Sequence, residues 1–246
     1  MAQVWADSGR IGRRAMWTPF RILVAILVVA VVGAGLLYWG VGRWTPGRDR
    51  YPLQGVAVSA RNGAVEWPTL RAQGVDFAYL AATGGSDRRD PSFGANWAQA
   101  RATGLRYGAI HAYSLCRAAS DQARLFIASV PRDNGALPPV VALDFEPGCA
   151  SRPDRDVVLS ELNTFLNEIE AHSGKPAILR ITEPFEQAYT VSGGINRTIW
   201  LDRDWLVPAY ASHPWVLWTA NRRKRLRGAE ETVEWTVVKP QASVEE

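Results

Sequence analysis

Short apolar runs alternate with segments of helical spacing through most of this 246-residue chain. Five runs rich in apolar, β-branched or aromatic residues come first, at positions 53–59, 75–83, 106–114, 139–146 and 176–182. Between most of them, apolar residues recur at three to five positions, as on the buried face of a helix. Strands that alternate with helices in this way imply parallel strands joined by crossover helices.

Three further runs, "RTIWLDRD", "PWVLWTAN" and "ETVEWTVV", follow Thr182 without comparable helices between them. Eight strands are enough to close a small barrel. The pattern therefore predicts an α/β fold: a modified TIM-like (β/α) barrel of five βα units followed by three strands, preceded by an N-terminal transmembrane helix. In such barrels, catalytic residues lie at the C-terminal ends of the strands.

The transmembrane prediction rests on Ile22–Trp39, an 18-residue stretch without a charged side chain. Its length suits a membrane span. A cleavable signal peptide is the alternative, but its apolar core is usually shorter, and no clear small-x-small site ends this stretch. Trp17, Tyr38 and Trp44 stand near its ends, as interfacial aromatic residues do. We therefore favour an uncleaved anchor.

The predicted domain boundaries follow from this anchor. They are a cytoplasmic tail at 1–21, the transmembrane segment at 22–42, a linker at 43–52 and the barrel at 53–240. Four arginines precede the span and three closely follow it, so the positive-inside bias toward a cytoplasmic N-terminus is weak. It places the barrel outside the membrane.

The formal net charge of +4 includes a basic run, "RRKRLR", at 222–227. Such a run can meet nucleic acid, lipid headgroups or an acidic polymer, or it can be a solvated loop. No nucleic-acid-binding motif accompanies it, and we expect no nucleic-acid partner.

The stretch "VVALDFEPGC" places two carboxylates, Asp144 and Glu146, at the end of an apolar run. Alternate residues of a strand share a face, so both acids would project together if the strand continued to Glu146. Two acids on one face of a buried strand are costly unless they are hydrogen-bonded or used in chemistry. An exposed strand end with solvated acids is the alternative.

The chain has two cysteines, too few for a zinc site and enough for one disulfide. Cys116 follows the third predicted strand and Cys149 follows the fourth, and adjacent parallel strands lie about 4.8 Å apart. A Cys116–Cys149 disulfide is therefore predicted, with independent buried thiols as the alternative. Such a bridge requires an oxidising compartment, which agrees with a barrel outside the membrane.

Several segments resemble glycoside hydrolase family 25, the Chalaropsis-type lysozymes or N-acetylmuramidases. They are "QGVAVSARNGAVEW", "GVDFAYLAATGG", "DPSFGANWAQARATGLRYGAIHAY" and "LPPVVALDFE", in the family's order and spacing. The resemblance runs from about Gln54 to Val238. It implies a modified (β/α) barrel that hydrolyses the β-1,4 bond between N-acetylmuramic acid and N-acetylglucosamine in peptidoglycan, without a cofactor. A place in the bacterial inner membrane, with the barrel on the periplasmic or extracytoplasmic side, follows from that substrate and the predicted anchor.

The resemblance also implies roles for the two acids. Glu146 would be the general acid/base, protonating the leaving oxygen and then activating water. Asp144 would orient or stabilise the N-acetyl group that assists the reaction. Glu146 would have to stay protonated near neutral pH.

Several positions depart from the family pattern. Ala57 stands where the first strand normally carries an aspartate, and Ala81 and Gly84 replace a lysine and a glutamate of the second strand. The late D-L-N motif reads "EWT" from Glu234. Two functions therefore stay open: a weakly or differently active muramidase, with Asp202 supplying the missing charge, or a membrane-tethered pseudoenzyme that binds glycan without cutting it.

Further candidates for substrate contact are Trp200, Trp218, His111 and Tyr79. The tryptophans would offer apolar platforms to sugar rings, and barrel core is the alternative role for each. His111 aligns with a histidine of the family's third strand, so it either faces the site from behind or is a hydrogen-bonded core histidine. No convergent ligand set indicates a metal.

Overall fold

The structure is a computed structural model that describes residues 17–240. The chain divides into two compact units at Arg43/Trp44. The first contains α1 (Trp17–Val41), in which Pro19–Tyr38 has a mean hydropathy of 2.7 and none of its most apolar window is buried. By length and composition this helix can cross a membrane or belong to a signal sequence.

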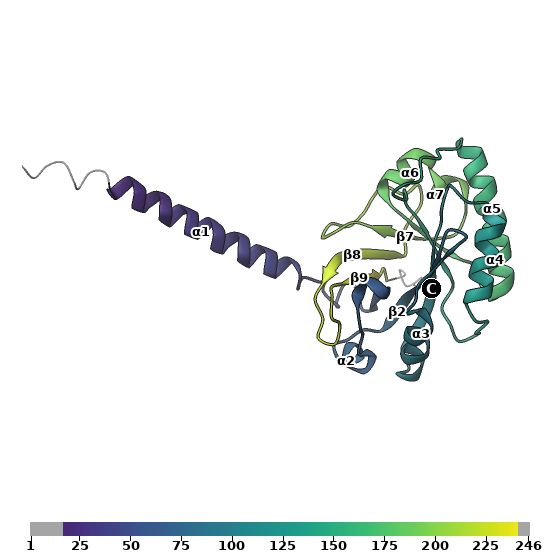
Figure 1. The fold of residues 1–246 in the computed structure, drawn as a ribbon, viewed down its shortest axis with the longest axis horizontal. Coiled ribbons are helices and arrows are strands. Elements are labelled where there is room, and N and C mark those ends of the chain that lie inside the picture. The colour runs from purple at the N-terminus through teal and green to yellow at the C-terminus, as the bar shows by residue number, and fades with distance from the viewer. Residues whose placement is uncertain (1–16, 241–246) are drawn as a thin grey trace, which may run out of the picture. The chain divides into compact units, whose positions relative to one another are not determined.

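The second unit is a closed barrel of eight strands (Figure 1). The strands are β1 (Gln54–Val58), β2 (Phe77–Gly84), β4 (Arg106–Ala112), β5 (Val140–Leu143), β6 (Ile178–Ile181), β7 (Thr198–Asp202), β8 (Leu217–Lys224) and β9 (Val233–Val238). Strands β1, β2 and β4 to β8 run parallel, β9 is antiparallel to both of its neighbours, and pairing of β1 with β2 closes the barrel. The two-residue strand β3 (Arg88–Arg89) forms a hairpin with β2.

Helices follow the first five barrel strands, as the sequence predicts. They are α2 (Trp67–Ala72), α3 (Phe93–Ala102), α4 (Ala119–Ser129), α5 (Arg155–Ser173) and the pair α6 (Glu183–Tyr189) and α7 (Val191–Gly194), with a short 3₁₀ helix at Ala60–Asn62. In this part of the chain, the connections from β7 to β8 and from β8 to β9 contain no helix. The prediction of five βα units followed by three strands is confirmed.

Strand residues alternate between two apolar layers, because successive side chains of a strand point to opposite faces. The barrel interior contains Ala57, Phe77, Tyr79, Ile110, Val140, Ile178, Trp200 and Leu217. The larger core lies between the strands and the surrounding helices, where α5 contributes Val158, Leu162, Phe165, Leu166 and Ile169. Both faces of the sheet are therefore buried, as in other barrels surrounded by helices.

Two segments differ in detail from the predicted ranges. Of the linker predicted at 43–52, residues 44–52 group with the barrel unit, in which Gln54 Nε2 donates to Pro46 O (3.0 Å) and Asn221 Nδ2 donates to Trp44 O (3.0 Å). Strand β5 ends at Leu143, before the two acids predicted to lie on it. Of the predicted tail at 1–21, residues 1–16 lie outside the described range.

Candidate active site

A cleft of about 790 Å³ opens at the C-terminal ends of the parallel strands. Asp144 and Glu146, from the segment after β5, both line it, together with Arg88, Arg180 and Asp202. The loss of strand geometry after Leu143 therefore does not separate the acids. The cleft contains the two carboxylates that the sequence places at the barrel mouth.

Glu146 lies beside a guanidinium. Arg88 Nη1 from β3 forms an ion pair with Glu146 Oε1, the two side chains being 55% and 23% exposed. A hydrogen bond with Ser114, followed by the bond and charge of Arg88 and the charge of Arg117, lowers the pKa of Glu146 below its ordinary value, while burial opposes the shift. These contacts favour the ionised carboxylate, contrary to the expectation that Glu146 is held protonated in the free protein.

Gly84 lies directly beside the guanidinium of this ion pair. A Cβ atom at Gly84 would lie 2.9 Å from Arg88 Nη2 and 3.3 Å from its Nε. The guanidinium therefore occupies space that a side chain at position 84 would need. Gly84, one of the departures from the family pattern, thus lies against the side chain of Arg88.

Asp144 is exposed and bonded at one oxygen. Its Oδ1 accepts from Thr182 Oγ1 (2.9 Å) and from the Phe145 amide (2.8 Å). Thr182, directly after β6, also donates its amide to Leu143 O (3.1 Å). These bonds hold the carboxylate between the ends of β5 and β6, and within residues 17–240 no hydrogen bond reaches Oδ2.

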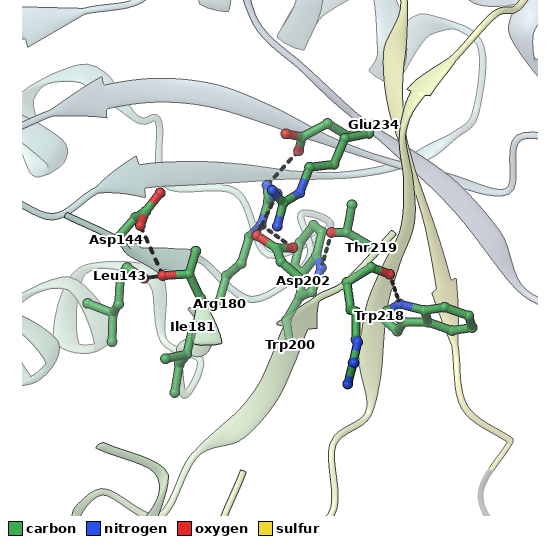
Figure 2. Close-up of polar contacts among 12 residues, drawn as sticks. Leu143, Asp144, Arg180, Ile181, Trp200, Asp202, Trp218, Thr219 and Glu234 are labelled. Atoms are coloured by element: carbon green, nitrogen blue, oxygen red, sulfur yellow. Dashed lines mark hydrogen bonds and ion pairs between the residues drawn. The ribbon is translucent and has the colours of Figure 1, made fainter. Parts of the chain in front are cut away.

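Arg180 on β6 joins two acids from other strands. Its Nε lies 3.0 Å from both carboxylate oxygens of Asp202 on β7, and its Nη1 lies 2.7 Å from Glu234 Oε2 on β9 (Figure 2). The Arg180 and Asp202 side chains are 11% and 5% exposed, and the guanidinium carbon lies 4.9 Å from the ring centroid of Trp200. Burial alone would lower the pKa of Arg180, but the two carboxylates raise it above its ordinary value.

Arg180, Asp202 and Glu234 form an ion triad that lies near Ala57, where the family's first-strand aspartate is absent. Ala57 is paired in register with Glu234, so the carboxylate of β9 stands beside the position where the first-strand acid is absent. Opposed residues of an antiparallel pair have Cβ atoms roughly 4.5–5.5 Å apart. In the sheet, Glu234 is thus nearer to Ala57 than Asp202 is. The sequence had suggested Asp202 as the residue that supplies the missing charge.

Small side chains form part of the cleft floor beside Arg180. Ala57, Ala81, Ala112 and Ala142 come from β1, β2, β4 and β5 and line a contiguous recess of about 450 Å³. Ala112 and Ala142 are in register, and Ala142 is in register with Arg180. The recess therefore combines a floor of small side chains with charged groups, among which are Arg180 and Glu234.

Two predicted substrate contacts, Trp200 and Tyr79, fill the barrel interior below this floor. Trp200 is fully buried and donates its Nε1–H to Thr219 Oγ1 (2.7 Å). Its ring centroid is 5.2 Å from that of Tyr79, which is 2% exposed. Neither ring offers a face to a sugar, so both are core residues.

Trp218 and His111 lie on the outer face of the barrel wall. Trp218 donates to Arg203 O (2.7 Å) and packs among other aromatic rings. His111 is fully buried between Thr83 and Gln122, with Nδ1 2.8 Å from the threonine hydroxyl. Burial lowers the pKa of His111 to about 4, which keeps the ring neutral at physiological pH. The structure assigns both residues to packing, not to the cleft.

Three residues of the cleft were not predicted from the sequence as site residues: Arg88, Arg180 and Glu234. Arg180 carried a signal, because a charge within the apolar run "PAILRIT" must find a partner if the run is a buried strand. Glu234 was noted as a family departure. Arg88 lies in a polar hairpin, and no local pattern distinguishes it from a solvated arginine.

The predicted disulfide is present. Cys116 and Cys149 are bonded, with their Cα atoms 5.8 Å apart. The Cys149 amide also donates to Glu146 O (3.1 Å), so the bridge closes the turn that carries the acid. Among residues 17–240, no group of three His, Cys, Asp or Glu side chains is arranged to hold a metal ion.

The family model for glycosyl hydrolases family 25 matches residues 56–224. The chain belongs to this family. It is therefore a lysozyme-like glycoside hydrolase, and the barrel with its acid-lined mouth is the family's fold. Among curated relatives, YegX of Escherichia coli (strain K12) is 28% identical over 198 residues, which cover 76% of this chain and 70% of that protein. Lysozyme M1 of Streptomyces globisporus is 29% identical over 157 residues, covering 57% of this chain and 53% of the relative.

Solved structures agree with this membership. A family 25 glycosyl hydrolase from Bacillus anthracis superimposes with a TM-score of 0.74 at 30% identity, over 80% of this chain and 93% of the solved chain. A muramidase from Acremonium alcalophilum shares the fold, with a TM-score of 0.67 at 18% identity, over 78% of this chain and 95% of the solved one. The solved chains correspond closely in extent to the barrel unit.

Proposed function

We propose that this protein hydrolyses peptidoglycan at the β-1,4 bond between N-acetylmuramic acid and N-acetylglucosamine. The observation that carries the proposal is the pair Asp144 and Glu146 in one cleft at the barrel mouth of a family 25 chain. Similarity to Lysozyme M1 and to the solved family 25 hydrolase supports the substrate class.

Glu146 is the proposed general acid/base and Asp144 the residue that orients the N-acetyl group. Asp144 suits this role because Oδ2 remains free to accept from an amide of the substrate while Oδ1 is held by Thr182. Glu146 must acquire a proton before it can donate one. Binding of a neutral sugar ring would exclude water and move Arg88, and both changes raise the pKa of a carboxyl group.

Asp202 and Glu234 are proposed to supply the negative field that the first strand lacks. Arg180 holds both carboxylates in place and cancels one of their two charges, which leaves a net negative site beside Ala57. A developing positive charge on the sugar ring would be stabilised by this site. Preorganised charge of this type is commonly a large contribution to catalysis.

We also propose that α1 stays uncleaved and holds the barrel on the extracytoplasmic side of a bacterial inner membrane. Its length and apolar composition support a span, and the disulfide supports an oxidising compartment. Fractionation of cells expressing the full chain, followed by N-terminal sequencing, tests this proposal. A soluble form that begins after α1 would identify a signal peptide.

The catalytic proposal is tested with the full chain and insoluble peptidoglycan, by measuring release of reducing muramic acid ends. Glu146→Gln should lower turnover roughly 10²-fold or more, because an amide cannot supply the proton. Glu183→Gln, on α6 beyond the cleft lining, is the matched control and should retain activity. Glycan binding without release of reducing ends by the unmodified chain would instead assign the pseudoenzyme role.

A further inference from the structure

The segment after β7 exposes three consecutive large apolar side chains. Trp205, Leu206 and Val207 are 44%, 60% and 44% exposed. Within the described part of the barrel unit, they account for half of the six large hydrophobic residues that are exposed, the others being Trp44, Leu53 and Val157. A contiguous exposed apolar group beside charged residues is typical of an interaction surface.

The backbone that presents this segment is strained. Trp205 has φ +62°, a left-handed conformation that bulky residues rarely adopt. It is held there because the Trp205 amide donates to Ala220 O (2.8 Å) and Trp218 Nε1 donates to Arg203 O (2.7 Å). Strain that the surrounding structure maintains at an exposed position points to use of that position.

A basic segment begins on β8, the strand that contains Trp218 and Ala220. Arg222, Arg223, Lys224, Arg225 and Arg227 occur within six residues. Within residues 17–240, the guanidinium groups of Arg223, Arg225 and Arg227 form no hydrogen bond or ion pair. Three cations are thus available to an external anion.

Nearby acids do not neutralise this segment. Asp204 Oδ1 accepts from the Arg222 amide (2.8 Å), and Glu230 Oε2 accepts from the Ala64 amide (2.9 Å). Glu231 is exposed at the rim of the alanine recess. Five basic side chains therefore face three acids, two of which bond to backbone amides.

The apolar and basic segments form one surface. The bond between Asp204 and the Arg222 amide links them directly. Asn221, the residue before Arg222, donates to Trp44 O (3.0 Å). In Figure 1 the connection after β7 and the β8–β9 hairpin lie on the side of the barrel away from α4 and α5. We call residues 205–207 and 222–227 the basic apolar face.

The connection between α1 and the barrel unit is short. Gly42 and Arg43 alone separate Val41, the last residue of α1, from Trp44. An extended chain spans at most about 3.6 Å per residue, so Trp44 lies within about 11 Å of the end of α1 in any orientation.

We propose that the basic apolar face binds the surface of a bilayer that contains anionic phospholipid. Arginine guanidiniums would pair with phosphate groups, and Trp205 and Leu206 would enter the interface between headgroups and acyl chains. The inference goes beyond glycan hydrolysis but rests on the proposed membrane attachment for its setting. It concerns the barrel's own surface, so it can fail while α1 is still a membrane anchor.

The test uses the barrel unit, residues 44–246, because it has its own core and corresponds to a chain solved by itself. Cosedimentation is measured with vesicles of phosphatidylcholine and with an equal mixture of phosphatidylcholine and phosphatidylglycerol. Each basic residue near an anionic surface raises affinity roughly fivefold. Arg223→Gln with Arg225→Gln should therefore weaken binding to the mixed vesicles roughly 25-fold at low salt.

Arg124→Gln with Arg132→Gln is the matched control, since it removes two positive charges from the α4 side of the barrel. It should bind nearly as the unmodified barrel does. Leu206→Ser should weaken binding roughly tenfold, a loss that salt does not abolish, if the side chain enters the interface. Equal losses in the control pair and the test pair would show a general charge effect and overturn the proposal.

Two further results would overturn it. One is unmodified barrel that binds mixed vesicles no better than phosphatidylcholine vesicles. The other is a soluble anionic polymer, such as heparin, that binds as tightly as the vesicles at equal charge and is insensitive to Leu206→Ser. Well-folded variants are verified by circular dichroism and by retained hydrolysis of peptidoglycan where hydrolysis is measurable.

A second measurement uses the full chain in proteoliposomes. Trypsin cleavage within 222–227 should be slower in bilayers that contain phosphatidylglycerol than in phosphatidylcholine alone, because bound headgroups protect the arginines. Cleavage at Arg124 should not change with lipid composition. Equal rates at 222–227 in both bilayers would contradict the proposal even if α1 spans both.

Discussion

The ion pair between Arg88 and Glu146 should have opposite effects on stability and on the proposed activity. The guanidinium stabilises the carboxylate, whereas Glu146 must carry a proton to serve as the proposed general acid. Arg88→Gln removes the charge and keeps a side chain of similar length. We expect this variant to be slightly less stable and more active near neutral pH than the unmodified protein.

The stability loss follows from the exposure of the pair. Because the Arg88 and Glu146 side chains are 55% and 23% exposed, the pair belongs with surface ion pairs, which contribute about 0–1 kcal/mol. A loss of about 0.5 kcal/mol lowers Tm by about 1–2 °C in a domain of this size. The Tm difference should be present at neutral pH, where Glu146 is ionised in both the folded and unfolded states.

The pH dependence has a definite sign. The pKa of Glu146 is lowered in the folded protein, so the pair contributes stability above the unfolded-state pKa of a glutamate, about 4.3. That contribution is lost as the pH falls through the folded-state pKa. The Tm values of the variant and the unmodified protein should therefore converge in acid.

The energy of the Arg88–Glu146 ion pair also determines how much activity Arg88→Gln should gain. A pair energy of about 0.5–1 kcal/mol corresponds to a protonated fraction roughly two- to fivefold higher on the alkaline side of the pKa. The alkaline limb of the kcat/KM profile should shift upward in pH by the corresponding amount. Muropeptide release between mildly acidic and mildly alkaline pH measures it.

Arg89→Gln is the matched control, because Arg89 lies on the same two-residue strand and bonds Ser129, not Glu146. It removes an equal charge from the cleft rim and should leave the alkaline limb in place. If Arg88→Gln instead abolished activity as completely as Glu146→Gln, Arg88 would be needed for substrate binding. The reasoning from pKa would then be refuted.

Three other perturbations test parts of the site. Ala57→Asp should raise muramidase activity by restoring the first-strand acid, at a cost of about 1–3 kcal/mol for a carboxylate added beside Glu234; unchanged activity in a folded variant would indicate a cleft remodelled beyond this position. Cys149→Ser, which opens a loop with a sequence separation of 33, should lower stability by about 3–4 kcal/mol in a denaturant titration, and reductant should have no further effect on the variant. Arg180→Met leaves the buried carboxylate of Asp202 and the partly exposed one of Glu234 without their partner and should cost about 3–5 kcal/mol at neutral pH, a loss that shrinks in acid; a pH-independent loss would argue against the ion triad.

The barrel was predictable because its signals are periodic. Apolar runs separated by helical segments, followed by three runs without helices, fix the number and order of the elements. The cysteine pairing followed from the neighbouring ends of the third and fourth strands. The end of β5 was not predictable, because the apolar side chain of Phe145 continues the alternation of the run beyond Leu143, where the strand hydrogen bonds stop.

Trp200, Trp218 and His111 were candidates for substrate contact, and the structure buries all three for a common physical reason. Alternation in a strand shows which residues share a face, but both faces of this barrel wall are apolar. Trp200 and Trp218 were therefore equally plausible as cleft residues and as core residues, and the structure buries them on opposite faces. His111, also, belongs to the outward set and is bonded to Gln122 of α4.

The ion triad of the site required three-dimensional information. Arg180, Asp202 and Glu234 come from three different strands, and their contacts cross the barrel floor. Sequence separation conceals such a triad, although a lone charge within an apolar strand signals that partners exist. The contact between Arg88 and Glu146 joins a hairpin to a loop, and neither segment has a periodic pattern.

The short connection between α1 and the barrel limits how far the barrel can lie from the end of α1. A unit of roughly 200 residues has a radius of gyration of about 17 Å, so no part of it can lie more than about 50–60 Å from the end of the helix, whatever the arrangement of the two units. With α1 retained in a bilayer, the cleft could reach only glycan within this distance of the membrane. Glycan strands that move farther outward would be out of its reach. Wall turnover by this chain would then be confined to the layer next to the membrane, and lengthening the connection at Gly42 with a flexible spacer should widen that layer.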